Sequence, residues 1–170
     1  EERFADVFAS VKRAPNALTE SLRAIPGIAD VQATVEQVVR VRLEGVSDPI
    51  VGRLIGIDDR EPPRMNRVVV RSGRAPEPGE AGRRGDGRIE ALVSAGFADV
   101  RGLRPGDTVT ALVNGKERGL LVVGTALSPE YVFASLGGHP DMRGFGVFWV
   151  DRDTLASAYD MEGAFTQVAV

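Results

Sequence analysis

The chain has 170 residues, of which 43% are hydrophobic and 26% charged, with a formal net charge of −3 and a pI near 5.3. This composition is that of a folded globular protein with an ordinary core, and it excludes a disordered chain. The acidic balance argues against a dedicated nucleic-acid binder, and the absence of cysteine excludes disulfides, thiolate catalysis and the usual zinc sites.

Two apolar series at helical spacing open the chain. The first predicts a helix over residues 2–13, and its members are Phe4, Val7, Phe8 and Val11. The second predicts a helix over residues 15–24, because Pro15 suits a first helical turn and Pro26-Gly27 ends the pattern.

Alternating apolar and polar residues then predict strands separated by turns. The expected strands cover residues 31–43, 49–57, 67–70, 89–94, 108–113, 119–124, 145–150 and 165–170. Short helices are expected from Ser94 to Val100, from Ser128 and over 151–159, with a turn at 104–107 and a hairpin at Asn114-Gly115. These elements together predict an α+β fold.

The composition changes after residue 57. Between Arg60 and Arg88, eight Arg residues face four acidic residues, so this stretch carries +4 while the remainder carries −7. Much of it is a turn-rich loop, and a strand–helix–strand pattern returns after His139. We therefore predict two subdomains: an α+β part made of residues 1–57 and 140–170, and an inserted β-rich part made of residues 58–139.

The stretch RGFGVFWV, residues 143–150, begins like the RNA-stacking strand of an RNA-recognition domain. That pattern needs aromatic rings at its third, fifth and eighth positions, which here are Phe145, Val147 and Val150. Two of the three rings are missing, and Phe148 points to the opposite face from Phe145. We therefore predict a strand buried on both faces, with Phe145, Phe148 and Trp149 in the core.

Catalytic and metal-binding patterns are weak throughout. The chain has no G-x-S-x-G and no P-loop, and its single histidine, His139, lies in a Pro/Gly-rich loop. Asp58 and Asp59, with Glu61 nearby, lack the alternating oxygen ligands of a calcium loop. The sequence therefore predicts no catalytic residues, no cofactor and no metal site.

The arginine-rich loop is the one stretch with the character of an interaction site. Arg83, Arg84 and Arg88 are candidate partner contacts, because Arg pairs well with carboxylates and phosphates and mobile loops often carry contacts. The alternative is a solvated connector, in which Arg67, Arg71 and Arg74 pair with the protein's own acidic residues.

Several segments, taken in order, resemble the periplasmic core domain of ABC transporter permeases of the MacB/FtsX type. They are RAPNALTESLRAIPGIADVQATV, GRAPEPGE, EALVSAGFADVRGLRPGDTV and FGVFWVDRDTLASAYDMEGAFTQVAV, and together they extend over most of the chain. The resemblance implies a porter-like α/β subdomain interrupted by a loop-rich insert, located between two membrane helices on the periplasmic side of the inner membrane.

The resemblance also implies a function. The domain would have no ATPase activity of its own and would respond to a separate nucleotide-binding subunit or domain. It would couple the movement of membrane helices to an adaptor, a lipoprotein or another envelope partner, or to cargo. Two alternatives remain open at this stage: a small-molecule enzyme and a stand-alone ligand-binding module.

Overall fold

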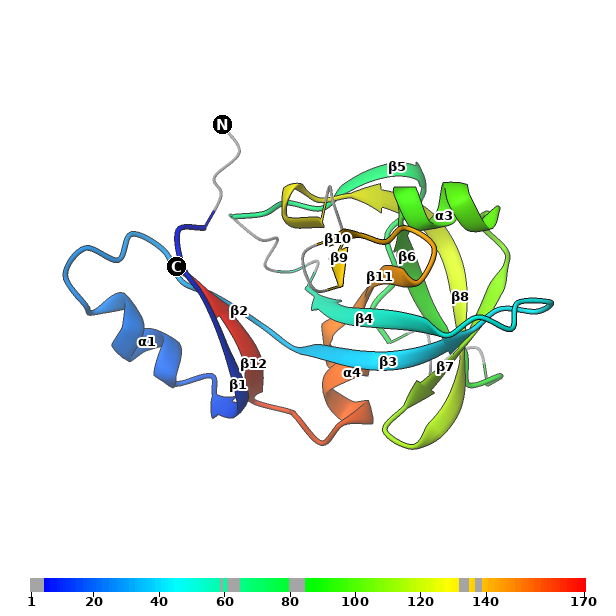
Figure 1. Cartoon of the computed structure of the whole chain (residues 1–170). Coiled ribbons are helices and arrows are strands. Elements are labelled where there is room, and N and C mark those ends of the chain that lie inside the picture. The colour runs from blue at the N-terminus through cyan, green and yellow to red at the C-terminus, as the bar shows by residue number, and fades with distance from the viewer. Residues whose placement is uncertain (1–4, 59, 61–64, 80–84, 132–134, 137–138) are drawn as a thin grey trace.

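The computed structural model of the chain describes residues 5–58, 60, 65–79, 85–131, 135–136 and 139–170. Within these ranges strands dominate and the helices are few and short, so the fold is a sheet-rich member of the α+β class. A small sheet lies beside a larger sheet that closes into a barrel (Figure 1). None of the helices in the described ranges is long and apolar enough to cross a membrane.

The larger sheet contains most of the strands. In order across the sheet they are β5 (Val69–Gly73), β8 (Lys116–Leu127), β6 (Ile89–Ser94), β11 (Phe145–Asp151), β4 (Ile50–Ile57), β3 (Glu36–Arg42) and β7 (Thr108–Val113). β7 and β8 also pair with each other, and this pairing closes the barrel. β5 pairs with the last part of β8, beyond Leu121, where the pairing of β8 with β7 stops.

The β7–β8 hairpin forms where the sequence predicts it. Asn114 and Gly115 have φ values of 47° and 75°, the left-handed backbone that a tight two-residue turn requires. The hairpin buries Val109, Ala111 and Leu120 in the main core of the barrel. The turn at 104–107 is also confirmed, because the Asp107 backbone N–H donates to the Arg104 carbonyl oxygen at 3.0 Å.

The small sheet joins the two ends of the described chain. Its strands are β1 (Phe8–Pro15), β12 (Ala164–Ala169) and β2 (Gln32–Thr34), with β12 in the middle and antiparallel to both neighbours. The helix α1 (Leu18–Arg23) packs on this sheet, with its Leu22 against a cluster formed by Ala14, Val31, Phe165 and Val168. The helix predicted over 15–24 is therefore confirmed in a shorter form.

The helix predicted over residues 2–13 is wrong. Residues 8–15 form β1, with Phe8 opposite Ala169 and Pro15 opposite Ala164, while residues 1–4 lie outside the described residues. The apolar spacing fits a helix, but backbone pairing with a strand about 150 residues away decides the structure. Pro15 is tolerated because it ends an edge strand.

The strand predicted over 31–43 is two strands in different sheets. The chain leaves the small sheet after Thr34, passes through the fully buried Val35 and enters the barrel at Glu36. The division into sheets places strands from both sides of residue 58 in one barrel, since β3 pairs with β7 and β11 pairs with β6. Hydrogen bonding between remote strands sets this division, whereas the composition change follows surface charge.

The remaining elements cover the barrel. They are α3 (Ala95–Arg101), the 3₁₀ turn η1 (Pro129–Tyr131), β9 (Ser135–Leu136), β10 (His139–Pro140) and α4 (Arg152–Ala158). α3 ends at Gly102 as predicted, and α4 is capped by Asp151, whose Oδ2 accepts from the Thr154 N–H at 2.9 Å. Of the helix predicted from Ser128, the structure describes the single turn η1, and residues 132–134 lie outside the described residues.

β11 is buried on both faces, as predicted. Phe145 and Trp149 belong to a cluster on one face, and Phe148 belongs to the main barrel core on the other. Phe145, Phe148 and Trp149 are 3%, 0% and 2% exposed. These aromatic rings therefore contact the protein's own core.

Candidate functional site

The predicted partner contacts lie mostly outside the described residues. This is true of Arg83 and Arg84, whereas Arg88 is described and immediately precedes β6. The Arg88 backbone N–H donates to Asp86 Oδ1 at 3.0 Å, and its Nε donates to Asp86 Oδ2 at 2.8 Å. Arg88 is therefore held by a neighbouring carboxylate and remains partly exposed.

Two other arginines of the basic stretch pair with the protein's own acids. Arg71 donates to Asp99 of α3 at 2.7 Å, and both these side chains are exposed. Arg74 binds both oxygens of Glu90 at 2.7 and 2.6 Å, and Glu90 is 3% exposed. The alternative that these arginines pair with the protein's own acidic residues is thus confirmed for Arg71 and Arg74. Arg67 is exposed and forms no ion pair with another described residue.

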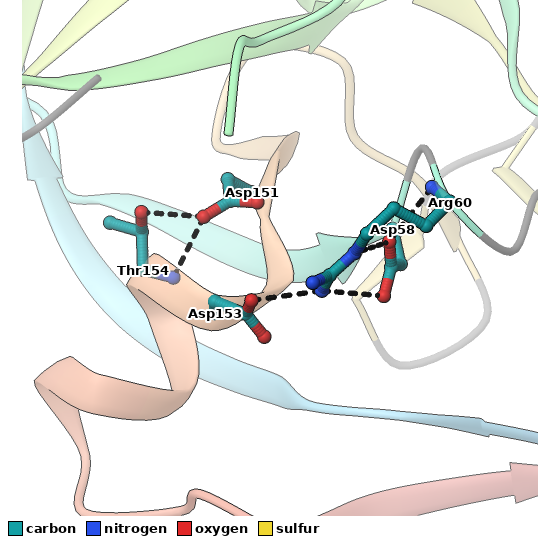
Figure 2. Close-up of polar contacts among 5 residues, drawn as sticks. All are labelled: Asp58, Arg60, Asp151, Asp153 and Thr154. Carbon is teal, nitrogen blue, oxygen red and sulfur yellow. Dashed lines mark hydrogen bonds and ion pairs between the residues drawn. The ribbon is translucent and has the colours of Figure 1, made fainter. Parts of the chain in front are cut away.

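A surface network connects the end of β4 to the start of α4 (Figure 2). Arg60 donates from Nε to Asp58 Oδ1 at 2.9 Å and from Nη2 to Asp153 Oδ2 at 2.9 Å. The hydrogen bonds from Arg60 lower the pKa of Asp58. Exposed ion pairs contribute little to stability, so the main effect of the network is to orient these groups. The Arg60 guanidinium contacts both carboxylate oxygens of Asp58, the residue that the sequence analysis considered as part of a calcium loop.

A second polar group, which we call the Arg53 cluster, is more deeply placed. Its members come from β3, β4, the segment before β5, and η1, and they are Glu36, Arg53, Asn66, Glu130 and Tyr131. Arg53 Nη1 donates to Glu36 Oε2 at 3.4 Å, and the guanidinium lies 5.9 Å from the centre of the Tyr131 ring. The cluster therefore fastens η1 to the outer surface of the β3–β4 pair.

Hydrogen bonding in the Arg53 cluster is incomplete. Asn66 Nδ2 donates to Glu130 Oε2 at 3.2 Å, but Asn66 Oδ1 is buried without a hydrogen bond of normal geometry to any described residue. The same is true of Arg53 Nε and the Tyr131 hydroxyl.

The two carboxylates of the cluster share one guanidinium. Burial raises the pKa of Glu36, and the Arg53 charge offsets this only in part. Burial likewise raises the pKa of Glu130, with Tyr131, Arg53 and Asn66 acting in the opposite direction. Keeping both groups ionised at neutral pH therefore lowers the stability of the fold.

Glu130→Gln is expected to raise the free energy of unfolding at neutral pH. A carboxyl group whose pKa is raised in the folded state favours folding at pH values below its pKa in the unfolded chain. This contribution to stability is lost as the pH rises through the pKa that the group has in the folded state. Urea titrations should show the variant more stable than the wild type at about pH 8, with the difference closing near about pH 4. Equal stability at both pH values would contradict the raised pKa of Glu130.

The sequence did not reveal the Arg53 cluster. Glu36, Arg53 and Glu130 are far apart along the chain, and only strand pairing brings the first two together. The available signal was the position of Glu36 and Arg53 within apolar strands, where a charged side chain needs a partner. Among the described residues, no group of three or more His, Cys, Asp or Glu side chains is placed to hold a metal ion.

The fold is similar to two solved extracytoplasmic domains of transporters. The first is the extracellular domain of the noncanonic ABC-type transporter YknZ from Gram-positive bacteria, with a TM-score of 0.53, 16% identity and coverage of 93% of this chain and 72% of that one. The second is the periplasmic region of MacB from Actinobacillus actinomycetemcomitans, with a TM-score of 0.52, 11% identity and coverage of 95% of this chain.

These likenesses confirm the resemblance inferred from the sequence at the level of the fold. The chain has the fold of extracytoplasmic domains of ABC transporters, and specifically that of the YknZ and MacB domains. It spans 72% of the length of the former and 65% of the latter. No protein-family model matches the chain, and no curated protein matches it.

Proposed function

We propose that this chain is a non-catalytic extracytoplasmic domain of an ABC transporter permease. In this role it is attached to the inner membrane in the full-length protein and faces the periplasm or the cell exterior. It couples membrane-helix movement, driven by a separate ATPase subunit or domain, to an adaptor, a lipoprotein, another envelope partner or cargo. The domain itself needs no catalytic residue, cofactor or metal for this task.

The fold similarity over nearly the whole chain carries the proposal. Both matched domains lie outside the cytoplasm according to their descriptions, and each covers more than nine tenths of this chain. The similarity is spread over both sheets instead of one common motif. We further propose that the small sheet with α1 is the porter-like part and that the barrel contains the insert.

The location of the domain provides a direct test. The chain has no cysteine, so Val38→Cys, at a position 63% exposed, adds a single thiol to this domain. In the full-length protein, freed of any other cysteine, a membrane-impermeant maleimide should label this thiol in intact spheroplasts. Val39→Cys, at the neighbouring position that is 4% exposed, should react only after denaturation. Labelling of Val38→Cys only after lysis would place the domain in the cytoplasm and overturn the proposal.

We also propose that Arg83, Arg84 and Arg88 contact an acidic envelope partner or anionic headgroups. The charge of +4 between residues 60 and 88, in an otherwise acidic chain, supports this contact. Replacing all three residues with Glu should weaken transport or partner binding by the full-length protein at low salt. Survival of both activities would show that the loop is a solvated connector.

A further inference from the structure

Among the described strands, β5 is the last strand at one edge of the larger sheet. It pairs only with β8 among the described strands, and all five of its residues are exposed. Its position at the margin of the barrel is visible in Figure 1. A strand in this position presents unpaired backbone donors and acceptors to other chains.

The β5 edge is also apolar where it is most regular. Val69 and Val70 are 50% and 40% exposed, and Leu127, directly opposite Val69 on β8, is 48% exposed. Proteins usually protect such edges with charged residues, proline or a bulge. Here the irregularity in pairing falls between Val70 and Ser72, after the apolar pair.

A small crevice adjoins this edge. It lies between the end of β8, the start of α3 and the turn before β11, and its walls include Leu127, Met142, Phe97, Trp149 and Tyr131. Met142 is 37% exposed. Leu127 belongs to both the crevice and the β5 edge, so exposed apolar side chains continue from the edge to the mouth of the crevice. Exposed apolar surface of this kind often marks an interaction site.

The charges beside the β5 edge indicate the partner. Arg67 precedes the strand and has no ion pair among the described residues, and Arg71 is held only by the exposed Asp99. An antiparallel second copy of β5 would bring these arginines close to their counterparts, and like charges across strands are unfavourable. An acidic segment would instead be attracted.

We propose that the β5 edge and its crevice bind an extended, acidic segment of a partner protein. The segment adds a short strand beside Val69 and Val70, and one of its apolar side chains packs on Leu127 at the mouth of the crevice. This is recognition by strand addition, in which backbone hydrogen bonds give affinity and the crevice gives specificity. The inference rests on the proposed function only in taking the partner to be an envelope protein.

A peptide titration of the isotope-labelled chain tests the proposal. The probe is a capped peptide of about seven residues in which Val alternates with Glu, the usual length of a strand. The control peptide alternates Val with Lys. Backbone amide shifts should change on titration with the probe only in residues 67–73, 125–128 and around Met142. Val69→Lys should weaken binding about tenfold, because one buried valine contributes roughly that much, and Val38→Lys is the matched control.

Each outcome decides the proposal. Absence of binding at millimolar probe, equal binding of the lysine peptide, or no effect of Val69→Lys would overturn it. Concentration-dependent shifts in β5 without peptide would identify a second copy as the occupant instead. Loss of binding in the Arg83, Arg84 and Arg88 triple Glu variant, with Val69→Lys unaffected, would place the contact on the loop. None of these results depends on where the domain lies in the cell, so failure here is distinct from failure of the labelling test.

Discussion

Replacing Phe148 with Ala is expected to lower the free energy of unfolding by about 3–5 kcal/mol. The ring is 0% exposed in the barrel core and meets Phe97 of α3 edge to face, with 5.9 Å between ring centres and 72° between ring planes. Gly146 and Gly52 adjoin the Phe148 ring, and neither has a side chain that could move into the space left by the substitution. The cavity left by the substitution would therefore persist and account for much of the loss.

Urea unfolding and the melting temperature measure this loss. The melting temperature should fall by roughly 10 °C, since a domain of this size loses about 2–4 °C per kcal/mol. Val38→Ala, at an exposed position on β3, should change stability by less than about 0.5 kcal/mol. A fall of only a couple of degrees for Phe148→Ala would mean that the ring is not packed in the core.

Gly124→Ala is expected to cost about 3 kcal/mol, at the upper end of the usual penalty for overpacking. A Cβ atom at this position of β8 would lie 2.5 Å from the Ser72 carbonyl oxygen and 2.8 Å from that of Arg74. Both are backbone atoms of β5 and the residue after it, and backbone cannot move aside as a side chain can. The substitution should therefore loosen β5 from the barrel.

Gly119→Ala on the same strand is the matched control. Its added Cβ atom would meet Arg88 Cγ at 3.0 Å and Thr108 Cγ2 at 3.1 Å, both in side chains with freedom to shift. The cost should stay below about 1 kcal/mol. Hydrogen exchange should show lost protection in β5 for Gly124→Ala alone. Equal stability of the two variants would contradict the close approach of β5 to β8.

The predicted partner contacts illustrate how far composition alone reaches. The excess of arginine between residues 60 and 88 predicts an interaction surface, but Arg71 and Arg74 form ion pairs with Asp99 and Glu90 of the same chain. Glu90 lies on β6, which pairs with β8, and it is 16 residues from Arg74 along the chain. Charge counting cannot tell a solvent-facing arginine from a paired one, because pairing depends on which strands become neighbours.

The sequence by itself determined the elements whose cause is local. The apolar run of β11 requires burial on both faces, and Asn114-Gly115 adopts the left-handed backbone of a tight hairpin. Asp151 likewise caps α4 with its own side chain. In each case the residues responsible lie within the element or next to it, so the local sequence pattern predicts the element.

Only the tertiary structure decided β1, the change of sheet at Val35, and the Arg53 cluster. β1 exists because Phe8 lies opposite Ala169, and its apolar spacing would equally suit a helix. Arg53 meets Glu36 and Tyr131 because β3, β4 and η1 converge on one surface of the barrel. A strand takes its hydrogen-bond partners from other parts of the chain, so its place in the fold depends on contacts that local sequence does not contain.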